Sequence, residues 1–381
     1  MSRVWVKIDF LGAPLSSRAR QLSSREPSRD LILTFFSNLQ ATVPAATSQR
    51  RGKKKRQSRN LAILALKKGV FRTLLLNWYK RNRRDLPWRV DRDPYRVWLS
   101  EIMLQQTRVA AVIDHYRRFL TRFPTIKRLA AAREASVLAV WSGLGYYRRA
   151  RMLHLTAKTV VKELNGEFPS TAESLRKLPG IGRYTAAAIA SIAFEEPAAA
   201  VDGNVERVLR RVVGSDLLLP QVWALAETLL SPNQPGDFNQ AMMELGAMVC
   251  LPRNPICTVC PIFDLCVTKG DLKQKGKITR QRKREIHYAL PRQAGSVFLV
   301  QRHKDESLMP GMWEFPEIVA ADCKSNLTLR HSITVTDYVV RVACVSIPPL
   351  DMSGKWVLES QIEKVALTGL ARKILVAAEI N

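Results

Sequence analysis

The spacing of apolar residues predicts helices through the first two thirds of the chain. From Lys67 to about Cys266, apolar positions recur every three or four residues, the period of a helix with one buried face. Pro94 opens a long segment at 95–122, which Phe123-Pro124 ends. Further helices are predicted at 135–141, 150–164, 185–193, 204–211, 222–230 and 238–249. No strand-like alternation interrupts them, so residues 66–268 are expected to form an all-α domain.

The pattern changes after this domain. Residues 269–286 hold eight Lys/Arg and two acids with little apolar content, which favours a basic linker. Beyond it, 295–302 and 336–347 are rich in strand-forming residues, and 365–378 has a helical pattern. Residues 287–381 are therefore expected to form a small α+β domain.

Charge narrows the class of partner. The net charge is +27, and residues 1–60 carry 13 Lys/Arg against 3 Asp/Glu. We expect residues 1–65 to be a basic, disordered extension that can touch DNA without sequence preference. The remaining chain is still strongly basic, which indicates a polyanion, with nucleic acid the first candidate and an acidic membrane surface the second. No apolar run is long enough to span a bilayer, and the N-terminus lacks the pattern of a secretory signal.

Four of the six cysteines are crowded together. Cys250, Cys257, Cys260 and Cys266 follow one another within 17 residues. This density favours metal ligation in a reducing compartment over a disulfide scaffold. Four thiolates can hold one Zn²⁺ or a [4Fe–4S] cluster, and the spacing alone does not choose between them. The other two, Cys323 and Cys344, have no close partner in sequence and are expected to be plain core or surface residues.

A glycine-rich turn separates two helical segments at 178–186. Its centre is Pro179-Gly180-Ile181-Gly182. Glycine lets a backbone approach a ligand closely, and the N–H groups that open the next helix suit a phosphate. The pattern is typical of a helix-hairpin-helix that grips a DNA backbone, although a plain turn between helices can also contain Gly.

Two carboxylates are candidates for chemistry. Asp202 comes just before a predicted helix, where the ordinary interpretation is an N-cap, a position that also holds a carboxylate in place. Glu101 lies at the edge of an apolar helical face, an environment that raises a carboxyl pKa and suits a general acid. Its ordinary interpretation is an exposed Glu on an amphipathic helix.

Together these features resemble one family, the MutY-type adenine DNA glycosylases. The resemblance is carried, in order, by Leu86-Pro87-Trp88-Arg89, residues 98–107, Gly143-Leu144-Gly145-Tyr146-Tyr147, the hairpin, residues 201–204, residues 238–246 and the four cysteines. It covers about 70–266 nearly continuously. It implies a helix-hairpin-helix glycosylase fold and a [4Fe–4S] cluster, because the cysteine spacing is similar to the cluster loop of endonuclease III.

The resemblance also implies roles for single residues. Glu101 would protonate adenine and Asp202 would stabilise the sugar cation, with Tyr184 close to Asp202. Endonuclease III-like relatives carry a lysine nucleophile where this chain has Tyr184, so base excision without strand cleavage is implied. Residues matching Gln106 and Tyr146 wedge into the duplex, residues matching Leu86, Trp88, Arg89 and Gln240 line the base pocket, and Gly180 and Gly182 belong to the backbone-gripping hairpin.

The last domain resembles, more weakly, the Nudix-like domain with which this family recognises 8-oxoguanine. The resemblance rests on 297–302 and 311–316, and a catalytic Nudix helix is absent. Many members carry a Phe-Ser-His loop, whereas this chain has His331-Ser332-Ile333-Thr334-Val335. Thr334 could supply the hydroxyl, but the aromatic and the second His are missing.

The function implied is removal of adenine paired with 8-oxoguanine or guanine in double-stranded DNA. We expect a monomer that acts inside the cell, in the bacterial cytoplasm or nucleoid, with no membrane association. A thymine or other mismatch glycosylase of the same superfamily is the first alternative, and an inert iron–sulfur DNA-binding protein is the second. Retention of both Glu101 and Asp202 argues against the inert protein.

Overall fold

The computed structural model divides the chain into two compact units, Met1–Ser58 and Arg59–Asn381. It describes residues 48–271, 282–306, 308–319, 326–333, 336–350 and 352–380. Thr334 and Cys323 therefore lie outside the described residues, as do residues 1–47 of the predicted extension.

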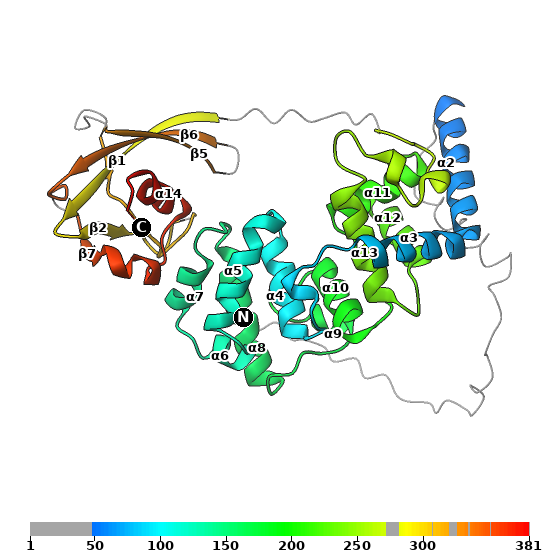
Figure 1. The fold of residues 1–381 in the computed structure, drawn as a ribbon, viewed down its shortest axis with the longest axis horizontal. Coiled ribbons are helices and arrows are strands. Elements are labelled where there is room, and N and C mark those ends of the chain that lie inside the picture. Colours follow the sequence, from blue (N-terminus) through cyan, green and yellow to red (C-terminus); the bar gives the residue numbers. More distant parts are fainter. Residues whose placement is uncertain are drawn as a thin grey trace, which may run out of the picture. The chain divides into compact units, whose positions relative to one another are not determined.

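Residues 48–271 contain helices and no strand, as the apolar spacing predicts. The α-helices are α2 (Ser48–Leu66), α3 (Lys68–Asn82), α4 (Pro94–Leu104), α5 (Val109–Arg122), α6 (Ile126–Ala130), α7 (Glu134–Trp141), α8 (Arg148–Glu163), α9 (Ala172–Leu175), α10 (Arg183–Phe194), α11 (Gly203–Val213), α12 (Leu219–Leu229) and α13 (Pro235–Met248). Short 3₁₀ turns are η1 (Pro87–Arg89), η2 (Cys257–Val259) and η3 (Phe263–Leu265). Figure 1 shows α4 and α10 near one another, and these two helices are in contact.

The long helix predicted at 95–122 is wrong in one respect, because it is two helices. α4 ends at Leu104 and α5 begins at Val109. Gln106, in the break, has a φ of 55°, in the left-handed region that non-glycine residues seldom adopt. Apolar spacing continues across the break, so periodicity alone did not reveal it.

The extension predicted to be disordered is helical over its last part. α2 runs from Ser48 to Leu66, and Leu61 and Leu64 are buried. Asn60 also donates from its side chain to the Val213 carbonyl at 2.9 Å. The prediction of disorder failed here because it rested on the high density of Lys and Arg, whereas this segment is a helix that buries two leucines.

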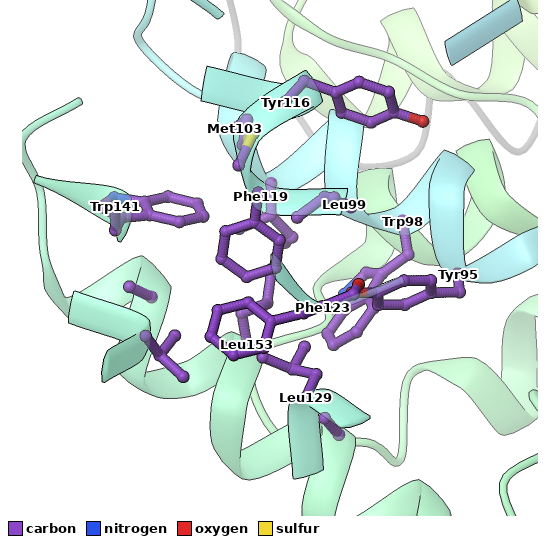
Figure 2. Packing of buried hydrophobic residues seen from close by; sticks show 14 of the residues in the cluster. Tyr95, Trp98, Leu99, Met103, Tyr116, Phe119, Phe123, Leu129, Trp141 and Leu153 are labelled. Atoms are coloured by element: carbon purple, nitrogen blue, oxygen red, sulfur yellow. The ribbon is translucent and has the colours of Figure 1, made fainter. Parts of the chain in front are cut away.

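An aromatic core lies around α4, α5 and α7 (Figure 2). Trp98, Phe119 and Trp141 are fully buried. Phe119 meets Trp141 edge-on, with ring centroids 6.1 Å apart, and aromatic pairs in this geometry add to the stability that burial provides. This packing holds α4 in place and so supports the residues on its opposite side.

The described residues of the C-terminal domain form a seven-stranded sheet. The strands are β1 (Arg282–Gln293), β2 (Ser296–Gln301), β3 (Trp313–Glu314), β4 (Glu317–Ile318), β5 (Leu327–Ile333), β6 (Thr336–Val345) and β7 (Gly354–Leu358). The main order is β3-β2-β1-β6-β5, with β4 paired to β1 and β7 to β2. β1 and β6 run parallel, with Arg282 opposite Thr336. This corrects the predicted linker, because its residues from Arg282 onward are strand; residues 272–281 lie outside the described residues.

A helix near the end of the described chain packs against this sheet. α14 (Gly369–Ala377) follows the 3₁₀ segment η5 (Glu359–Lys364), and its Ile374 and Leu375 are buried with Val297 and Leu299 of β2. The predicted α+β character of the domain is thus confirmed. No helix among the described residues is long and apolar enough to cross a membrane.

Candidate active site

One large cleft among the described residues is lined by most of the residues singled out in the sequence. It takes residues from η1, α4, α8, α10, α11 and α13. The sequence-predicted residues at this cleft are Leu86, Trp88, Arg89, Glu101, Gln106, Tyr146, Gly180, Tyr184, Asp202 and Gln240. Gly182 does not line it, and Thr334 lies outside the described residues. Residues up to 154 positions apart in sequence therefore meet in one concave surface.

Glu101 is buried, not exposed as its ordinary interpretation would have it. It is 7% exposed and accepts a hydrogen bond of 2.6 Å from the Tyr184 hydroxyl. Burial raises the pKa of Glu101 to about 7, the Tyr184 hydrogen bond opposes this, and the nearby Asp202 charge adds to it. A carboxyl with this pKa is a proton donor at neutral pH.

Asp202 is an N-cap, as its ordinary interpretation predicts, and its carboxylate also faces the cleft. Its Oδ1 accepts from the Val205 backbone N–H at 2.7 Å, and its Oδ2 accepts from the Asn204 side chain at 2.8 Å. Burial raises its pKa, while these hydrogen bonds and Arg207 lower it. The cap thus fixes the position of a carboxylate near Glu101.

Tyr184 connects the two acids electrostatically. Burial raises its pKa well above the ordinary value, and the charges of Glu101 and Asp202 raise it further. The hydroxyl therefore stays protonated and acts as a hydrogen-bond donor. It also lies 3.1 Å from the sulfur of Met243.

Beside these acids lies a second buried glutamate that the sequence analysis did not assign. Glu244 on α13 is 1% exposed. Arg84 donates to both of its oxygens at 2.8 Å, and Arg89 donates to them at 3.2 and 3.0 Å. Burial alone would raise the pKa of Glu244, but the two arginines outweigh it and bring the pKa to about 2.

This ion network orders the pocket residues predicted by the resemblance. Arg89 also donates from Nε to the Gln240 side-chain oxygen at 3.2 Å, and Leu86 and Trp88 on the same segment are buried. An acid on an apolar helix, four residues after Gln240 and on the same helical face, was the available sequence signal for Glu244.

The two residues predicted to wedge into DNA share an unusual backbone. Gln106 has a φ of 55° and Tyr146 a φ of 47°. Tyr146 is 55% exposed, a large fraction for an aromatic residue at the edge of a cleft. Both residues lie in tight turns with a left-handed backbone conformation that is unfavourable for residues other than glycine.

The hairpin has the close packing expected of a glycine turn. Gly180 has a φ of 74°, and a Cβ there would lie 2.9 Å from the Cβ of Met152. Gly182 is the N-cap of α10 and offers no side chain to its first N–H groups. The start of α10 thus keeps free donors, although Gly182 itself does not line the cleft.

The four clustered cysteines line one small cavity, together with Arg211 and Ile262. Burial and the neighbouring cysteines raise the pKa of Cys257, and burial is the largest cause that raises that of Cys260 to about 11. Arg211 donates toward the Cys250 sulfur at 3.3 Å. Among the described residues, no three Cys, His, Asp or Glu side chains are already arranged to hold a metal ion.

Known proteins are similar to this chain in sequence and in fold. Residues 99–218 match the model of the HhH-GPD superfamily of base excision DNA repair proteins. A solved thermostable thymine-DNA glycosylase aligns with a TM-score of 0.51 and 32% identity, over 53% of this chain and 96% of that one.

Two relatives carry the same name. The adenine DNA glycosylase of Mus musculus is 43% identical over 312 residues, which is 65% of this chain. This chain spans only 60% of the length of that mouse protein. The adenine DNA glycosylase of Buchnera aphidicola subsp. Schizaphis graminum (strain Sg) is 36% identical over 65% of this chain and 74% of its own length. The chain therefore belongs to the adenine DNA glycosylase family.

Proposed function

We propose that this chain is a monofunctional DNA N-glycosylase that removes adenine paired with 8-oxoguanine or guanine. The observation that carries the proposal is the pair of carboxyl groups in one cleft, with Glu101 buried and protonatable near neutral pH and Asp202 fixed by its capping hydrogen bonds. Two carboxyl groups in different environments are what cleavage of a glycosidic bond requires.

The two acids divide the reaction between them. Glu101 donates its proton to a ring nitrogen of the purine, so the base leaves as neutral adenine when the C1′–N9 bond breaks. The electron pair of that bond goes to the base and the sugar becomes an oxocarbenium cation, which the Asp202 carboxylate stabilises. Water then adds to the sugar carbon and loses a proton, leaving an abasic site.

Tyr184 supports the assignment of base excision alone. Its phenol has no amine to attack the sugar, and burial keeps it protonated. It donates to Glu101, so its role is to orient the acid and to lie beside the sugar site. Strand cleavage through a Schiff base is not expected.

The target adenine must leave the base stack before it can reach Glu101, which costs a few kcal/mol. We assign this step to Gln106 and Tyr146, on the two tight turns at the edge of the cleft. Leu86, Trp88, Arg89 and Gln240 then receive the extruded base. Gly180 and Gly182, at the start of α10, bind a phosphate of the DNA backbone.

The four cysteines suit a [4Fe–4S] cluster. They share one cavity, and four thiolates are the ligand set of such a cluster. The cluster would hold the segment from Cys250 to Cys266 in shape. The iron and sulfide content of the purified protein and its absorbance near 400 nm test this assignment. Cys260→Ser is expected to lower the cluster content and this absorbance. Zinc in place of iron would contradict the assignment.

The C-terminal domain is proposed to read the base opposite adenine, through a Nudix-like fold. Its β5 carries His331 and Ser332, near the Thr334 position that the sequence analysis selected. The partner is double-stranded DNA with 8-oxoguanine:A or G:A pairs, and the enzyme acts as a monomer inside the cell.

A panel of duplexes tests the function. Duplexes with A or T opposite 8-oxoguanine or G are incubated with the protein, and abasic sites are then cleaved with alkali. Breaks at A alone support the proposal. Breaks at T would favour a thymine glycosylase, and no breaks would favour an inert DNA-binding protein.

The variant Glu101→Gln is the matched control for this panel. It keeps the size of the side chain and an acceptor for Tyr184, but it has no acidic proton to transfer to the base. We expect it to bind mismatch DNA and to excise no adenine. Full excision by a clean preparation of this variant would contradict the assignment of Glu101.

A further inference from the structure

Arg149, near the start of α8, is the most extensively bonded side chain of the cleft among the described residues. Its Nη1 donates to the carbonyls of Ile102, Met103 and Gln105 at 2.8, 2.9 and 2.6 Å. Its Nη2 donates to the Thr107 hydroxyl at 3.1 Å. These four acceptors belong to the end of α4 and to the turn that carries Gln106.

The same guanidinium also holds the other turn. Nη2 lies 3.2 Å from the Leu144 carbonyl and 3.3 Å from the Gly145 carbonyl. The guanidinium carbon lies 5.4 Å from the ring centroids of both Trp141 and Tyr146. One side chain therefore contacts the residues that flank Gln106 and the residues that flank Tyr146.

The carbonyl groups at the end of α4 show why this contact matters. The Thr107 N–H donates to the Leu104 carbonyl at 3.2 Å. Arg149 donates to the carbonyls of Ile102, Met103 and Gln105. A helix end leaves carbonyls that need such partners, and a cation there is favourable. The guanidinium thus ends α4 and permits the sharp turn at Gln106.

The location of Arg149 is electrostatically unfavourable in two respects, which indicates a functional role. A cation near the N-terminus of α8 opposes the dipole of that helix. Burial lowers the pKa of Arg149 to about 10, and its contacts in the described part of the chain are carbonyls, a hydroxyl and two rings, with no carboxylate. Residues that break a local rule in this way tend to lie at functional sites.

We propose that Arg149 is a positioning residue that couples the two turns, so that Gln106 and Tyr146 enter DNA as one preformed wedge. This rests on the proposed function of those two residues. Lysine is a poor substitute, because its ammonium has three donors and no planar fork to bridge both turns.

Arg72 provides a matched control. It is also a half-buried arginine that donates to helix-end carbonyls, at Leu229 (2.9 Å) and Thr228 (3.3 Å). Burial lowers its pKa too, and it does not line the cleft. Loss of either arginine should weaken a helix end, but only loss of Arg149 should affect base extrusion.

The experiment uses Arg149→Met, Arg149→Lys and Arg72→Met in the full chain. Fluorescence of 2-aminopurine at the target position measures extrusion, and single-turnover excision measures chemistry. We expect Arg149→Met to lower the excision rate on the order of 100-fold, with reduced fluorescence and nearly unchanged affinity for matched duplex. Arg149→Lys should be intermediate, and Arg72→Met should extrude and excise as the unaltered protein does.

A double-mutant design separates coupling from a general structural effect. In a protein that already carries Gln106→Ala and Tyr146→Ala, Arg149→Lys should cause little further loss. The proposal would be overturned if Arg149→Lys lowered the excision rate by the same factor in this background as in the unaltered protein. It would also be overturned if Arg149→Met extruded the base as well as Arg72→Met does. If the unaltered protein extrudes the base but excises no adenine, the proposed function fails and the positioning role stands.

Discussion

Two buried glutamates in one cleft have opposite pKa shifts. Glu101 has one hydroxyl donor and a neighbouring acid, and its pKa is about 7. Glu244 has two arginines, and its pKa is about 2. Burial favours the neutral form of both, so the number of cationic partners decides which one is charged at neutral pH. Glu101 can therefore exchange a proton near neutral pH, whereas Glu244 stays ionised and holds Arg84 and Arg89 in place.

After the complete loss expected for Glu101→Gln, the next largest effect concerns the acid beside Glu101. Asp202→Asn should keep the N-cap, because Asn caps helices as well as Asp does, but it removes the negative charge that we propose stabilises the sugar cation. We expect excision to fall on the order of 10³-fold, with an unfolding midpoint close to that of the unaltered protein. If the unfolding midpoint fell together with the excision rate, the role of Asp202 would be that of an N-cap alone.

The same substitution should have opposite effects on stability in the two regions. Glu244→Gln leaves Arg84 and Arg89 without their carboxylate and should lower the free energy of unfolding by about 3 kcal/mol. Glu101→Gln at pH 8 removes a buried charge and should raise it, by up to about 3 kcal/mol. Denaturant unfolding at pH 8 measures both.

The signs follow from linkage. Glu101 has a folded pKa above its ordinary 4.5, so its favourable contribution is complete below pH 4.5 and is lost as pH rises through 7. Glu244 has a folded pKa below 4.5, so its contribution is present above pH 4.5 and is lost as pH falls toward 2. Equal signs for the two Gln variants at pH 8 would break the comparison.

The rate of excision should report the proton on Glu101. Since the acid must be protonated, single-turnover excision should fall as pH rises through about 7, by roughly tenfold per pH unit above it. Binding measured at the same pH values provides the control. A rate that stays flat from pH 6 to pH 9 would remove Glu101 as the proton donor.

The smallest effect is expected at the hydrogen bond to Glu101. Tyr184→Phe removes a donor that lowers the pKa of Glu101, so the falling limb of the pH profile should move to higher pH. The profile of Tyr184→Phe against that of the unaltered protein measures this. Movement to lower pH would show that Tyr184 acts in another way.

The local pattern predicted most elements because their determinants lie within a few residues. Asp202 as an N-cap, the Gly180 turn and the apolar faces of α7, α8 and α10 through α13 were readable in this way, as was the family. The break between α4 and α5 was not readable, because it depends on a residue far away in sequence. Arg149 donates to the Ile102 and Met103 carbonyls at the end of α4.

By itself the sequence determined the helical and sheet domains, the order of the motifs and the types of residue available for chemistry. Only the tertiary structure decided which of those residues meet. It buried Glu101 under Tyr184, placed Arg84 and Arg89 on Glu244, and joined two turns through Arg149. The physical reason is that a pKa and a turn conformation depend on neighbours far away in sequence, whereas a helix or a cap depends on neighbours close by.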